Sequence, residues 1–118
     1  MSLTVNLRRR RALVTGASSG LGRHFAQVLH RAGAAVVLAA RRTSRLDDHV
    51  RQLGGRASAG AIDGRDAASV TAAIAAAGAL DILVNNAGVA VTKPPLDQSE
   101  SEWKEIIDTN LSGAFLVA

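Results

Sequence analysis

The stretch Thr15-Gly16-Ala17-Ser18-Ser19-Gly20-Leu21-Gly22 decides how the rest of this chain is organised. It follows the apolar run Ala12 to Val14 and opens an amphipathic segment, so it predicts the turn from a first strand into a first helix. Phosphate groups bind at such turns, because the helix end offers free N–H groups and a partial positive charge. We expect Gly16 to take a conformation that other residues resist, Gly20 to let a phosphate approach the backbone, and Gly22 to let the helix pack closely.

The glycines of this turn follow the spacing G-x-x-x-G-x-G. This differs from the dinucleotide pattern G-x-G-x-x-G and from the phosphate loop G-x-x-x-x-G-K-S/T. No lysine follows the last glycine, which disfavours an ATPase. A turn of small residues that binds nothing is the alternative at this point.

The composition is that of one globular domain covering residues 1–118. Hydrophobic residues make up 47% of the chain and charged residues 20%, and there is no cysteine. Disulfides, thiolate metal sites and a cysteine nucleophile are therefore excluded, and no metal site is predicted. No apolar run approaches the roughly 20 residues that span a bilayer, and the start lacks a signal-peptide core. We expect a cytoplasmic protein with no membrane partner.

The net charge of +4 and the run Arg8 to Arg11 raise the question of nucleic acid. Clustered arginines neutralise phosphates, but the only aromatic residues are Phe25, Trp103 and Phe115, which do not predict a platform for stacked bases. We therefore interpret the run as a solvated lead-in to the first strand and expect no nucleic-acid partner. An RNA-binding protein remains a third hypothesis, which predicts salt-dependent binding that is lost when the run is neutralised.

Strand-like and helix-like segments alternate along the chain. Strands are expected at residues 12–14, 35–40, 57–62 and 81–84. Helices are expected at 21–32, then from a cap at Thr43 or Ser44 to a stop at Gly54, then from a cap at Asp66 to a stop at Gly78, and finally from a capping box of Ser99 and Glu102. This alternation predicts an α/β fold, a doubly wound parallel sheet covered on both faces. In the strand order 3-2-1-4, a crevice opens beside strand one, where the turns Gly16 to Gly22 and Asn85 to Gly88 meet.

The helical periodicities predict which residues face the core. In the first helix Leu21, Phe25, Val28, Leu29 and Ala32 form the apolar stripe, with His24 and His30 on the solvated side. His49, in the second helix, lies at the border of its stripe, packed or solvated. Asn110 lies inside the apolar stripe of the last helix, where it either bridges backbone groups or serves a site. The other members of that stripe are Trp103, Ile106, Ile107, Leu111, Ala114 and Ala118.

Four motifs occur in the order Thr15-Gly16-x-x-x-Gly20-x-Gly22, Asp63, Asn85-Asn86-Ala87-Gly88 and Asn110-Leu111-x-Gly113. With these the chain resembles the short-chain dehydrogenases/reductases over nearly its whole length. The resemblance implies a Rossmann-type sheet that binds NAD(H) or NADP(H), here truncated after about four strands. It also implies hydride transfer between the nicotinamide and a carbonyl or alcohol substrate, and a homodimer or homotetramer.

The resemblance also assigns roles to matching positions. Asn110 matches the asparagine that positions a water in the family's proton relay, and Asn85 is expected to tie strands together. The pyrophosphate and adenosine ribose of the cofactor would be contacted by Gly16, Ser18, Ser19, Gly20 and Leu21, with Gly22 in the same turn. Asp63 and Gly64 would contact the adenine. Asn86, Ala87 and Gly88 would lie along the cofactor toward the nicotinamide.

The choice between NADP(H) and NAD(H) is predicted from charge at the end of the second strand. A similar protein that prefers NAD(H) would carry an acid there, whereas this chain has Ala40 followed by Arg41 and Arg42. A guanidinium binds the 2′-phosphate bidentately. Arg41, supported by Arg42, is therefore predicted to select NADP(H); two solvated arginines that open a loop are the alternative.

The chain departs from the family in one respect. It contains no tyrosine, so the Tyr-x-x-x-Lys pair on which the family's chemistry rests is absent from these 118 residues. Since a general acid is required, we expect no turnover by this chain alone, and we interpret it as the cofactor-binding half of a longer reductase. A free edge of the fourth strand would leave it marginally stable or oligomeric. A non-catalytic dinucleotide-binding or regulatory module is the alternative function.

Overall fold

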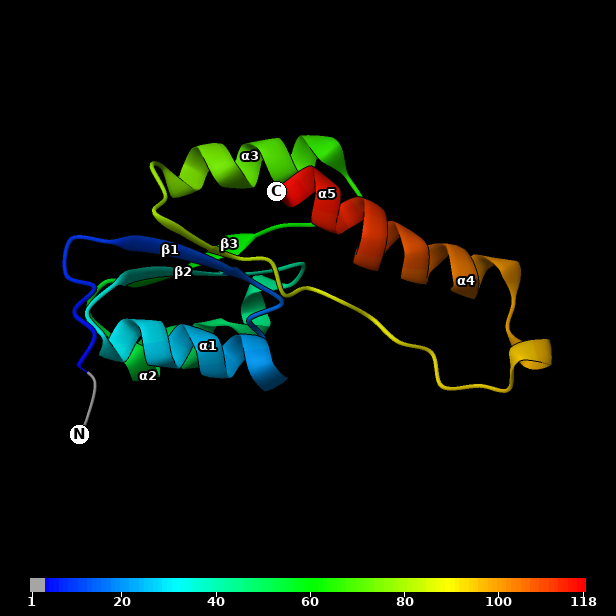
Figure 1. Ribbon diagram of the computed structural model, residues 1–118, viewed down its shortest axis with the longest axis horizontal. Helices are drawn as coiled ribbons and strands as arrows, with labels where there is room; N and C mark the ends of the chain where they lie inside the picture. The colour runs from blue at the N-terminus through cyan, green and yellow to red at the C-terminus, as the bar shows by residue number, and fades with distance from the viewer. Residues whose placement is uncertain (1–3) are drawn as a thin grey trace.

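The computed structural model describes residues 4–118, which build one parallel sheet flanked by helices (Figure 1). The sheet has four strands in the order β3-β2-β1-β4, which confirms the predicted topology. Their bounds are β1 (Arg11–Thr15), β2 (Ala35–Ala40), β3 (Ala57–Ala61) and β4 (Ile82–Val84).

The two inner strands carry the apolar runs. β1 pairs in parallel with β2, placing Leu13 opposite Val37, and with β4, placing Leu13 opposite Leu83. The middle four residues of β2 are buried, as expected for a strand covered on both faces. β3 forms one edge of the sheet and is largely exposed.

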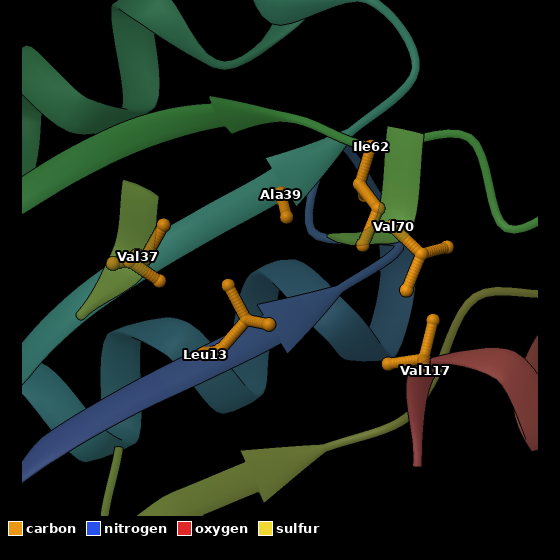
Figure 2. Close-up of a cluster of buried hydrophobic side chains, with 7 residues drawn as sticks. Leu13, Val37, Ala39, Ile62, Val70 and Val117 are labelled. Atoms are coloured by element: carbon orange, nitrogen blue, oxygen red, sulfur yellow. The ribbon is translucent and has the colours of Figure 1, made fainter. Parts of the chain in front are cut away.

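Helices cover both faces of the sheet. α1 (Gly20–Arg31) and α2 (Asp47–Leu53) lie on one face, and α3 (Ala67–Ala77) and α5 (Gly113–Val117) on the other (Figure 1). A separate apolar core fills each layer, since a two-sided sheet buries side chains in both directions. In the layer under α3 and α5, Leu13 and Val117 belong to one cluster with side chains of β2 and α3 (Figure 2).

Several predicted helix ends are confirmed. α2 ends at Gly54 with φ +64°, and α3 at Gly78 with φ +79°, in the backbone region that favours glycine. The Asp66 side chain caps α3 by accepting from the Ala68 N–H at 3.0 Å. Ser99 and Glu102 form the predicted capping box at the start of α4 (Glu100–Ile107).

The predicted inner stripe of α1 was only partly right: Phe25 and Leu29 pack against the core, but Leu21 and Val28 do not. Gly22 and Ala26 are the buried residues, whereas Leu21 is 67% and Val28 47% exposed. The helix comes so close to the β1 turn that only small side chains fit between them. His30 is also not simply solvated, because its Nε2 lies 3.0 Å from the Gly54 carbonyl oxygen.

The start of the second helix was also predicted wrongly. Neither Thr43 nor Ser44 caps an α-helix; both belong to a 3-10 turn, η1 (Thr43–Arg45), which precedes α2. α2 then begins without a side-chain cap. Leu46, between the two, is fully buried and links the turn to the core.

The last helix is not a single α-helix. After the 3-10 turn η2 (Pro95–Asp97) come α4, a π-helical turn η3 (Asp108–Ser112) and α5. The wider turn shifts the helical register, so the predicted continuous stripe fails, and Trp103 and Leu111 are 57% and 66% exposed. Across residues 4–118, no helix is both long enough and apolar enough to cross a membrane.

Candidate dinucleotide-binding site

A cavity of about 330 Å³ lies where the predicted turns converge, at the carboxyl ends of the strands. Its wall comes from the β1–α1 turn, the end of β2 with η1, the loops after β3 and β4, and η3 with α5. The predicted site residues that line it are Gly16, Ser18, Arg41, Arg42, Asp63, Gly64, Ala87 and Gly88. The predicted residues outside its wall are Ser19, Gly20, Leu21, Gly22, Asn86 and Asn110.

The glycines of the β1–α1 turn have the geometry expected of a phosphate cradle. Gly16 has φ +62°, and a Cβ on it would lie 2.9 Å from the Cα of Ala87. A Cβ on Gly22 would overlap the Gly16 carbonyl oxygen, so the predicted close packing of the helix is confirmed. Gly20 has φ +58° and no atom within 4 Å of the Cβ position, which leaves its backbone open to a ligand. The turn therefore fits a bound phosphate group.

The beginning of α1 is available to an anion. The side chain of its N-cap residue, Ser19, makes no capping hydrogen bond, and the first turn carries no acid. The first N–H groups of a helix have no partner within the helix, and the helix dipole adds a partial positive charge there. A phosphate at this end would satisfy both.

The structure gives the strand-tying role expected of Asn85 to its neighbour Asn86. Asn86 ties the strands, because its backbone N–H donates to the Thr15 hydroxyl at 2.9 Å and its side chain donates to the carbonyls of Thr15 and Gly16 at 3.3 and 3.4 Å. Asn85 instead lines the cavity and donates to the Ala114 carbonyl at 2.8 Å, which joins the β4 loop to α5.

Asp63 carries the negative charge in the cavity wall, and Arg65 is paired with it. The Arg65 Nε and Nη2 atoms donate to the two Asp63 oxygens, each at 3.1 Å. This hydrogen bonding holds the pKa of Asp63 below its ordinary value, with Arg41 adding a smaller effect. The carboxylate is therefore charged near neutral pH.

Asn110 bridges backbone groups. It is exposed rather than buried; its Oδ1 accepts from the Val89 N–H and its Nδ2 donates to the Val89 carbonyl, both at 2.8 Å. This pair of bonds holds η3 against the loop after β4. The side chain keeps one N–H and one lone pair for a further partner.

Sequence reasoning missed part of the cavity wall. η3 and α5 also line the cavity, through Thr109 and Gly113. Gly113 packs against the loop after β3, because a Cβ on Gly113 would lie 3.0 Å from the Gly64 carbonyl oxygen. Gly113 belongs to the motif Asn110-Leu111-x-Gly113, but the spacing of that motif did not indicate that Gly113 contacts the loop of Gly64. Arg45 was also missed, because a basic residue after a strand normally reads as solvated.

Four parallel strands with a glycine-rich turn at the point where the strand order reverses define a Rossmann-type fold. Residues 10–118 match the family model described as short chain dehydrogenase. The chain therefore belongs to the short-chain dehydrogenase/reductase family, an oxidoreductase family that binds NAD(P)(H). In the part of the chain that the structure describes, no group of three or more His, Cys, Asp or Glu residues is arranged to hold a metal.

Named relatives agree with this membership. The chain is 36% identical to L-xylulose reductase of Bos taurus over 116 residues, covering 98% of this chain and 47% of that protein. It is 36% identical to 3-oxoacyl-acyl-carrier-protein reductase of Vibrio cholerae over 115 residues, covering 94% and 47%. Both are reductases, which does not favour the non-catalytic module. The chain thus spans less than half the length of these relatives.

Solved structures show the same fold. The 3-ketoacyl-(acyl-carrier-protein) reductase of Brucella melitensis, complexed with NADH, superposes with a TM-score of 0.90 at 34% identity, covering 95% of this chain and 48% of that one. A short-chain type dehydrogenase/reductase of Mycobacterium marinum gives 0.88 at 35% identity, covering 95% and 48%.

Proposed function

We propose that this chain forms the NADP(H)-binding part of an oxidoreductase that transfers hydride between the nicotinamide and a small carbonyl or alcohol substrate. The observation that carries the proposal is the charge at the end of β2. Arg41 and Arg42 line the same cavity as Gly16 and Gly88, and no acid stands at that strand end to repel a 2′-phosphate.

The cofactor would extend along the carboxyl ends of the strands. Its pyrophosphate would bind the open N–H groups of the β1–α1 turn, and its adenine would lie against Asp63 and Gly64, where the carboxylate paired with Arg65 keeps acceptor capacity. Ala87 and Gly88 would flank the half toward the nicotinamide. The remaining contacts are proposed for Ser18, Ser19, Gly20, Leu21 and Asn86.

Asn110 is proposed as a positioning residue for a water in the proton relay. Its two bonds to Val89 fix the amide, and its remaining N–H and lone pair are the groups that a water would contact. The proton itself requires a general acid, and the 118 residues contain no tyrosine. We therefore propose that this chain alone binds the cofactor without turnover, and that it assembles as a homo-oligomer.

A calorimetric titration with NADPH and with NADH tests the cofactor site. We expect NADPH to bind more tightly, and the Arg41→Ala variant to lose roughly 10- to 100-fold of its NADPH affinity while NADH binding is kept, since a charge-assisted bidentate contact is removed. Arg31→Ala is the matched control, because Arg31 lies in the last turn of α1, outside the cavity wall. Equal binding of both cofactors by the unsubstituted chain would refute the NADP(H) preference, and binding of neither would refute the site.

A further inference from the structure

The 3-10 turn η1 places two arginines on one side of the chain. The Arg45 N–H donates to the Arg42 carbonyl at 3.3 Å, and the Leu46 N–H to the Thr43 carbonyl at 2.8 Å. Residues three apart eclipse one another in such a turn, and both Arg42 and Arg45 line the cavity. Arg45 therefore lines the site from a different element than Arg41, which directly follows β2.

The position of Arg45 is fixed by the core. Its neighbour Leu46 is 0% exposed, packs in the layer of α1 and α2, and accepts from the Val50 N–H at 2.9 Å. The backbone at the rim is thus held in place before any ligand arrives. Because the backbone that carries Arg45 is already ordered, less conformational entropy is lost when a ligand binds.

Among the described residues, no carboxylate forms an ion pair with the arginines at this rim. Asp63 is the acid of the cavity wall, and Arg65, which is outside that wall, occupies its carboxylate at 3.1 Å. Within residues 4–118, the side chains of Arg41, Arg42 and Arg45 form no ion pair or hydrogen bond with the protein. The three arginines that line the cavity therefore keep their guanidinium donors available to a ligand.

We propose that Arg45 binds the 2′-phosphate of NADP(H) together with Arg41, with Arg42 beside it at the positive rim. The inference rests on the proposed NADP(H) site and deepens it. A phosphate monoester carries about −1.5 to −2 charges at neutral pH, so a single guanidinium does not neutralise it. Two arginines from different elements can each bind it through parallel N–H groups.

The test compares two fragments that differ in the 2′-phosphate, 2′,5′-ADP and 5′-AMP, in an NMR-monitored titration of the 118-residue chain. We expect Arg45→Ala to weaken 2′,5′-ADP binding roughly 10- to 100-fold and to leave 5′-AMP binding unchanged. Arg51→Ala is the matched control, since Arg51 lies on the next helix, pairs with Asp48 and is outside the cavity wall. It should change the affinity of both fragments by less than about twofold. Arg45→Gln gives the same comparison if the alanine variant does not fold.

The outcomes separate this inference from the proposed function. An equal loss for both fragments, or an equal effect of Arg51→Ala, would overturn the role of Arg45 while leaving NADP(H) binding intact. A chain that prefers NADPH, but whose Arg45 variants keep full discrimination between the fragments, would do the same. Failure of the unsubstituted chain to bind either fragment or either cofactor would overturn both.

Discussion

The hydroxyl of Thr15, at the end of β1, accepts hydrogen bonds from the backbone N–H groups of Asn86 at 2.9 Å and Ala87 at 3.0 Å. Thr15 is 1% exposed, and its hydroxyl oxygen satisfies two part-buried N–H groups of the loop after β4. The two turns that form the cavity are joined through it.

Replacing that hydroxyl should therefore loosen both turns. We expect Thr15→Val to lower the free energy of unfolding by about 1–3 kcal/mol, because two part-buried donors lose their acceptor. Urea unfolding followed by circular dichroism measures the change. Thr15→Ser, which keeps the hydroxyl, is the control, and an equal loss in both variants would contradict the role assigned to the hydroxyl.

Gly22 offers a test of helix packing. Gly22→Ala forces α1 away from the Gly16 carbonyl, and we expect it to cost about 1–3 kcal/mol in unfolding free energy and to weaken NADPH binding. Gly78→Ala is the control: Gly78 has φ +79° but open space around it, so only the backbone cost of roughly 1–2 kcal/mol applies, without effect on NADPH. Unchanged NADPH affinity in Gly22→Ala would contradict the cradle.

Asn110 should hold η3 to the loop after β4. Asn110→Ala removes both bonds to Val89, and we expect faster hydrogen exchange at the Val89 amide and a loss of about 1–2 kcal/mol in unfolding free energy. Gln98→Ala is the control, since it removes a single, longer bond of 3.4 Å to Val91 in the same loop. Equal exchange rates in the two variants would argue against the bridge.

His49 should make stability depend on pH. It is 5% exposed and its Nδ1 has no partner among residues 4–118; burial lowers the pKa of His49 below 6.5, and Arg23 adds to this. As pH falls below about 6.5, the unfolded chain takes up a proton that the folded chain resists, so the free energy of unfolding decreases. His49→Leu should flatten this slope, whereas His24→Gln, at an exposed position, should keep it. A slope that survives in His49→Leu would refute the assignment.

Asp63 and Arg65 should behave as a linked pair. The hydrogen bond from Arg65 lowers the pKa of Asp63 below 3.8, so its stabilisation is present above that value and is lost as pH falls through the folded pKa. An NMR titration of the carboxyl carbon should show the pKa of Asp63 rising toward 3.8 in Arg65→Met. Arg51→Met, which removes the exposed partner of Asp48, should leave the pKa of Asp63 unchanged.

Much of the fold could be predicted because it depends on local patterns. The run Ala35–Ala40 reads as a buried strand, Gly54 and Gly78 end helices through their backbone freedom, and Ser99 with Glu102 closes a capping box within four residues. The inner face of α1 could be predicted only in part, since Phe25 and Leu29 pack on the core as expected, but the closeness of Gly22 to the β1 turn brings Gly22 inward in place of Leu21. The position of the cavity could be predicted, but its full wall could not, because periodicity does not indicate that η3 lines it.

The sequence by itself determined the order of strands and helices, the crevice beside β1 and the glycine turn that opens it, since each follows from residue type and spacing along the chain. Only the tertiary structure decided that Asn86 rather than Asn85 ties the strands, that Asn110 bonds Val89, and that Arg45 faces the same cavity as Arg41. These are contacts between segments distant in sequence or turned by a non-α helix. Their geometry is set by how the layers pack, which spacing does not encode.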